Sequence, residues 1–263
     1  MTPNLSYRLR RLVNDPVFLG FIIGGLVVLN LSFFGSGVPE AMNLRMSDYR
    51  KAVTFWSAIE KVARIVLPLF SMYLGVRLVG PELPGGHFYV ELAHVERKGT
   101  VFWNHLRVAL TALLGFLALV FVNVWLFNVI FKVPGSARNM IEFMVGYTSQ
   151  SLAYLSVGLI ASTLMYGWSG LALCLAAFVA GDVVNMGEVP FLYVRARLPS
   201  IVRGPLMFVL PTNGAIIKID NPELAQRIPA FIFRMGVPYF LYQIVWSTGV
   251  AALALRIMKR KDY

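Results

Sequence analysis

The side chains that could do chemistry are few, and they lie inside or beside long apolar segments. Ser149 and Gln150, with nearby serines, give a polar stripe to a stretch without charge, and Asp182 and Glu188 follow at its C-terminal end. If this stretch crosses a membrane, its carboxylates are costly and either line a pathway or pair with a base. We expect Ser149, Gln150, Asp182 and Glu188 to form an intramembrane polar pathway. Two alternatives remain: the hydroxyls serve helix packing, and the carboxylates lie at a membrane boundary.

Histidine and carboxylate side chains also gather in one polar segment, where they could in principle hold zinc. The histidines are His87, His94 and His105. Their spacing fits no ligand pair on one helix, and no cysteine accompanies them, so we predict no metal site. No nucleophile–base set has a recognisable context, and no Gly-rich phosphate loop is present. We therefore predict a chain that is not an enzyme, without catalytic residues or a cofactor of its own.

Composition indicates the solvent in which this chain folds. Of 263 residues, 57% are hydrophobic and 14% are charged, whereas a soluble domain carries about 25% charge. The apolar surplus requires lipid. The net charge of +11 comes mostly from clusters between apolar runs, which favours anionic headgroups over nucleic acid as the partner.

Apolar runs of roughly 20 residues mark candidate membrane spans, and the weak one, 55–79, is uncharged only over Ile65–Val76. The expected spans are 17–38, 55–79, 107–131, 143–167, 170–192 and 231–256. The break between the fourth and fifth rests on Tyr166–Gly170, a turn-forming aromatic segment. We predict an all-α polytopic membrane protein, a single transmembrane domain over 1–263. An interfacial elbow helix is expected over Tyr7–Val13, and a re-entrant segment over about 195–228 before the last span.

Basic residues flank both outer spans. Arg8, Arg10 and Arg11 precede the first, and Arg256 and Lys259 follow the last. The positive-inside rule therefore predicts a cell-membrane protein with both termini in the cytoplasm. The basic segment 193–234 would then be external, which hints at an anionic substrate or cell-surface layer.

The polar loop 80–107 carries a resemblance to a known family. An acidic residue follows a span, a glycine comes four residues later, an apolar-rich helix follows, and a basic residue enters the next span. This order resembles the first cytoplasmic loop of ABC-2 type permeases, the membrane subunits of one class of ABC transporter. The matching positions are Glu82, Gly86, Leu92-Ala93 and Arg97. The sequence departs from the family pattern at His94, where a proline is expected, and at His105 or Arg107, where a lysine is usual.

The resemblance implies a coupling helix that docks onto a separate ABC ATPase subunit. The docking residues it implies are Glu82, Gly86, Phe88, Glu91, Leu92, Val95 and Arg97. Phe88, Leu92 and Val95 share one helical face, which suits burial in a groove. ATP and Mg would be bound by that partner. A second permease copy or a related permease and the lipid bilayer complete the implied assembly, with no nucleic acid.

Three alternatives stay open. The loop helix could simply lie on lipid. The chain could be an accessory or anchoring subunit of a larger membrane complex, for example a respiratory one. It could also be a stand-alone intramembrane enzyme or ion-coupled carrier that works through Asp182 and Glu188.

Overall fold

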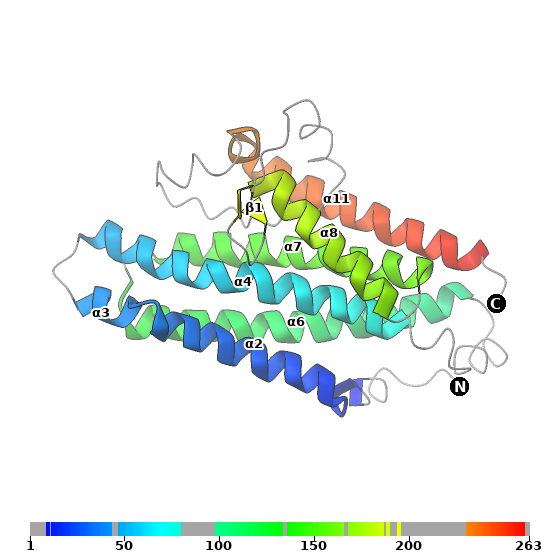
Figure 1. The fold of residues 1–263 in the computed structure, drawn as a ribbon, viewed down its shortest axis with the longest axis horizontal. Helices are drawn as coiled ribbons and strands as arrows, with labels where there is room; N and C mark the ends of the chain where they lie inside the picture. The colour runs from blue at the N-terminus through cyan, green and yellow to red at the C-terminus, as the bar shows by residue number, and fades with distance from the viewer. Residues whose placement is uncertain are drawn as a thin grey trace.

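The computed structural model describes residues 9–10, 12–43, 47–79, 98–133, 136–165, 168–186, 188–189, 194–195 and 230–260 (Figure 1). The long helices are α2 (Pro16–Gly35), α4 (Asp48–Val79), α6 (Lys98–Ile130), α7 (Ser136–Leu164), α8 (Trp168–Met186) and α11 (Ala230–Arg260). A short helix, α3 (Val38–Asn43), follows α2. Strand β1 (Glu188–Val189) pairs antiparallel with β2 (Val194–Arg195).

Successive long helices alternate in direction. Between α4 and α7, the rings of Trp56 and Phe143 lie 5.7 Å apart near the start of both helices. The two glycines that face each other near their ends are Gly75 and Gly158. Helices α4 and α7 therefore run the same way, and α6 between them runs back. As a result α2 begins, and α11 ends, at the same end of the bundle (Figure 1).

We call this shared end the terminal end and the opposite one the distal end. At the terminal end, Arg77 Nε lies 3.0 Å from Asp15 Oδ2, which joins the end of α4 to the start of α2. A Cβ placed on Gly99 would lie 3.3 Å from Lys259 Cε, which places the start of α6 beside the end of α11. The C-terminal ends of α2 and α6 and the starts of α4 and α7 lie at the distal end.

Helix α4 is the centre of the bundle. It packs against α2, α3, α6, α7 and α8, and its residues from Phe70 to Val76 are all buried. Aromatic rings fill the space toward α2 and α6, with Phe70 and Phe116 centred 4.2 Å apart. Helix α7 packs on the other side, between α4, α8 and α11.

The outside of the bundle is apolar. Leu31, Ile130 and Val245 are 66%, 65% and 69% exposed, and exposed apolar side chains recur along α2 and α6. Three helices in the described part of the chain are long and apolar enough to cross a membrane, over Pro16–Gly35, Gly99–Ile130 and Leu241–Arg260. Because water would not tolerate such a surface on a monomer, these helices indicate a membrane protein.

The all-α expectation is confirmed for the described residues, apart from the two short strands. The expected break at 166–170 is confirmed, since α7 ends at Leu164 and α8 begins at Trp168. Two helices extend beyond the expected spans: α4 begins at Asp48, before 55–79, and α6 begins at Lys98, before 107–131. The expected helix over 170–192 is wrong at its C-terminal end, because α8 ends at Met186 and Glu188–Val189 form β1. Charge-free runs mark the part of a helix that needs lipid, whereas the backbone continues its hydrogen bonds into flanking charged turns.

Helix α6 ends in a Schellman motif that uses a lysine. Lys132 has φ of 48°; its N–H bonds to the Val129 carbonyl, and the Val133 N–H bonds to the Asn128 carbonyl, at 3.3 and 3.2 Å. Glycine is the usual residue at this left-handed position. The motif closes the helix and turns the chain toward α7.

Candidate functional site

The described residues place an unusual amount of neutral polar surface inside the bundle, most of it on α7. The buried polar residues of α7 are Ser149, Gln150, Ser151, Ser156, Ser162 and Thr163. No charged residue occurs between Phe143 and the end of this helix. Hydroxyl and amide groups cost less than carboxylates to hold in an apolar interior, provided that they find partners.

One face of α7 finds its partners on α11. Ser149 Oγ lies 2.7 Å from Gln243 Oε1, and Ser156 Oγ donates to the Ser247 carbonyl at 3.0 Å. Ser247 Oγ in turn donates to the Gln243 carbonyl at 2.6 Å. These contacts form a polar zipper, defined here by Ser149, Ser156, Gln243 and Ser247, between two helices that run in the same direction.

The hydroxyl of Ser149 has two acceptors within reach and one hydrogen to give. Besides Gln243 Oε1, it lies 2.8 Å from the Gly146 carbonyl. Rotation of the Gln243 amide by half a turn would let its nitrogen donate to Ser149 instead. The zipper therefore has more than one hydrogen-bond arrangement of similar geometry, a property suited to an interface that rearranges.

Other polar atoms in the core lack partners. Several polar groups are buried without a hydrogen bond to the described residues: the amide nitrogen and oxygen of Gln150, the Ser151 hydroxyl and the Trp56 Nε1 group. Each such group costs roughly 1–3 kcal/mol when left unsatisfied. The described core thus holds polar groups that a water molecule or a polar ligand would satisfy.

A close helix crossing lies beyond this region, toward the terminal end. A Cβ on Gly75 would meet the Gly158 Cα and the Leu155 carbonyl oxygen, both at 2.7 Å. A Cβ on Gly158 would meet the Met72 carbonyl oxygen at 2.6 Å. Only glycine fits at either position, so the backbones of α4 and α7 can approach closely at this crossing.

Exposed basic side chains gather at the terminal end, where Arg10, Arg77, Arg107, Arg256 and Lys259 lie on the described helices. The distal end carries exposed charges as well, among them Arg50 and Lys132. Asp15 caps α2 by accepting from the Val17 N–H at 2.9 Å. Burial alone would raise the pKa of Asp15, but the hydrogen bond from Val17 and the Arg77 guanidinium outweigh it, and the pKa is lowered.

The predicted site residues meet different outcomes. Ser149 and Gln150 are buried inside the bundle, and their place in a polar pathway stays a prediction. Asp182 belongs to α8, near its end, whereas Glu188 belongs to β1 with Arg195 as its register partner. Glu188 is therefore not on the expected fifth helix. All seven predicted docking residues, from Glu82 to Arg97, lie outside the described residues, as do His87 and His94.

The sequence reading missed Gln243 and Ser247, the partners of the α7 hydroxyls. Their spacing by four residues on the last apolar helix was an available signal. It also missed Gly75, whose role depends on a glycine far along the chain, and Asn128, one of two asparagines in an apolar run.

The chain was compared with protein-family models and with curated proteins, and nothing in either set matches it. Its function is therefore argued from the residues and their arrangement.

Proposed function

We propose that this chain is the permease subunit of an ABC-2 type transporter, which moves a substrate across the cell membrane with ATP hydrolysed by a separate subunit. The observation that carries the proposal is α7. A helix that carries no charge from Phe143 to its end and holds buried hydroxyl and amide groups, set between α4 and α11 in the interior of an apolar bundle, is the lining that a transport pathway needs.

The arrangement of the ends supports the same proposal. Because the long helices alternate, α4 ends and α6 begins at the terminal end, where Arg77, Arg256 and Lys259 are exposed. This is the end that the positive-inside rule assigns to the cytoplasm. A loop there is accessible to an ATPase, and force on it acts directly on the central helix.

The proposed motion separates α7 from its neighbours as rigid bodies. Opening would break the Ser149–Gln243 and Ser156–Ser247 contacts, and it would let water reach Gln150 and Ser151. The gain from satisfying those unpartnered groups offsets part of the cost of parting the helices. ATP-driven closure of the partner subunits supplies the remainder.

The first test is co-purification of an ATPase with the tagged chain from mild detergent. We expect a P-loop ATPase to co-purify, and we expect Phe88→Asp, Leu92→Asp and Val95→Asp to abolish its capture. Val90→Asp is the matched control, because helical spacing puts Val90 on the opposite face. Capture of other membrane or redox subunits without an ATPase would instead support an anchoring subunit.

The second test addresses the pathway. Cys174 is the only cysteine of the sequence, so Cys174→Ala gives a background for single reporters. Gln150→Cys should resist a polar maleimide at rest and react during ATP turnover. Met72→Cys, from the fully buried part of α4, is the control that should resist in both states. A Gln150→Cys that stays unreactive during turnover would exclude this part of α7 from the pathway.

A further inference from the structure

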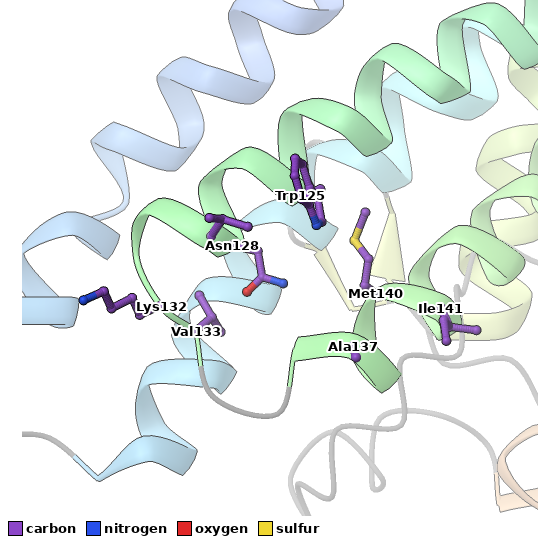
Figure 2. A pocket seen from close by; sticks show the side chains of 8 residues that line it. Trp125, Asn128, Lys132, Val133, Ala137, Met140 and Ile141 are labelled. Carbon is purple, nitrogen blue, oxygen red and sulfur yellow. The ribbon is translucent and has the colours of Figure 1, made fainter.

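A cavity of about 420 Å³ opens at the distal corner where α6 ends and α7 begins (Figure 2). Its lining residues are Trp125, Asn128, Val129, Lys132, Val133, Ala137, Met140 and Ile141. It is separate from the α7–α11 zipper. Its volume falls within the range of small-molecule binding sites.

Asn128 marks this cavity as more than a packing gap. The residue is 6% exposed, and its Oδ1 atom is buried without a hydrogen bond to any described residue. Figure 2 shows its amide on the cavity wall, between Val133 and Met140. An unpartnered amide costs roughly 1–3 kcal/mol, and a half-turn of the amide can present either of its polar atoms to the cavity. The described residues around the cavity therefore offer this oxygen no hydrogen-bond donor.

The two helices supply opposite partial charges at the same corner. The C-terminus of α6 carries the negative end of its dipole, and the N-terminus of α7 carries the positive end. The first turn of α7 contains no acidic residue that would neutralise it. A group with a positive part near Asn128 and a negative part near Ala137 would match both ends.

Lys132 adds a mobile positive charge at the rim. It is exposed, and Figure 2 shows its side chain extended away from Asn128. Its long stem lets the ammonium reach a phosphate at the mouth of the cavity.

The rest of the wall is apolar and opens to the lipid-facing surface. Trp125, Val129 and Ile141 are 53%, 55% and 62% exposed. Trp125 and Val129 lie at the end of the apolar span Gly99–Ile130, next to Lys132, and Ile141 lies on α7. Tryptophan and lysine at the end of a span mark the level of lipid headgroups.

We propose that this corner binds the head of a phospholipid that carries a primary ammonium group. The ammonium donates to Asn128 Oδ1 at the end of α6. The phosphate lies at the first turn of α7 within reach of Lys132, and one acyl chain runs along Val129 and Ile141. The proposal depends on the membrane setting and not on the transport activity.

The test compares two lipids that differ only in methylation of the headgroup nitrogen. The purified chain is exchanged into nanodiscs that contain phosphatidylethanolamine, phosphatidylcholine or mixtures, and retained lipid is counted by native mass spectrometry. We expect preferential retention of phosphatidylethanolamine by about tenfold, because the choline head cannot donate a hydrogen bond to Asn128. Asn128→Leu should remove the preference. Asn104→Leu, a partly exposed asparagine on the same helix, should keep it.

A second variant keeps the test independent of any folding defect in Asn128→Leu. Ile141→Trp changes an exposed residue and fills the mouth of the cavity, so it should abolish retention of phosphatidylethanolamine. Equal retention of the two lipids by the unaltered chain, or an unchanged preference in Ile141→Trp, would overturn the proposal. Equally tight binding of soluble phosphoethanolamine would do so as well, because the site would then recognise a free head and not a lipid.

Discussion

The crossing of α4 and α7 gives the sharpest prediction, because its geometry leaves no room for a side chain. A Cβ on Gly75 would lie 2.7 Å from backbone atoms of α7, about 0.7 Å inside ordinary van der Waals contact. Backbone atoms cannot rotate away as side chains do, so Gly75→Ala must push the two helices apart. Overpacking of this kind costs roughly 1–3 kcal/mol.

The intrinsic helix preference of alanine over glycine works in the opposite direction, by about 0.5–1 kcal/mol. A matched control removes this contribution. Gly115→Ala lies in the middle of α6, where an added Cβ meets no atom within 4 Å. The difference between the two variants therefore isolates the crossing. We expect Gly75→Ala to be less stable than Gly115→Ala by about 1–3 kcal/mol.

The measurement is equilibrium unfolding in mixed micelles, followed by circular dichroism for both variants and the unaltered chain. Gly158→Ala should behave like Gly75→Ala, since a Cβ there meets the Met72 carbonyl oxygen at 2.6 Å. The double variant should be non-additive, because one separation relieves both clashes. If Gly75→Ala and Gly115→Ala agree within about 0.5 kcal/mol, α4 and α7 do not cross at these glycines.

Three further predictions concern other contacts. Lys132→Gly should raise the free energy of unfolding by about 1 kcal/mol, because glycine adopts the left-handed conformation without the Cβ penalty. Thermal unfolding in detergent measures the change, and no gain in stability would contradict the left-handed conformation at Lys132. The lowered pKa of Asp15 means that its pairing with Arg77 stabilises the fold above the ordinary aspartate pKa and is lost as pH falls through the lower, folded value. Asp15→Asn should therefore reduce the loss in free energy of unfolding at acid pH, by about 0.5 kcal/mol because Arg77 is half exposed. An acid profile identical to that of the unaltered chain would argue against the ion pair. Asn123 Nδ2 donates to Asn30 Oδ1 at 3.2 Å between two candidate spans. A double-mutant cycle with leucine at both positions should give a coupling free energy of about 0.6 kcal/mol. A coupling of zero would contradict the contact.

The amino-acid sequence by itself determined that the chain folds in lipid and which segments form helices. Long runs without charge need lipid and must satisfy their backbone groups internally, so they form helices wherever they are placed. The break near Gly167 followed from local turn chemistry, and α8 does begin at Trp168. The ends of the helices were harder to predict from the sequence. His105 and Arg107 interrupt an apolar run, but helix α6 continues through them.

Only the tertiary structure decided which faces meet. Helical periodicity places Ser149 and Ser156 on one side of α7, but it does not say that Gln243 and Ser247 lie opposite them. The partner of each face depends on how the whole bundle packs. The same holds for Asn128, which the sequence presents as an ordinary polar residue near a helix end. Its unpartnered oxygen exists because of the corner that α6 and α7 form together.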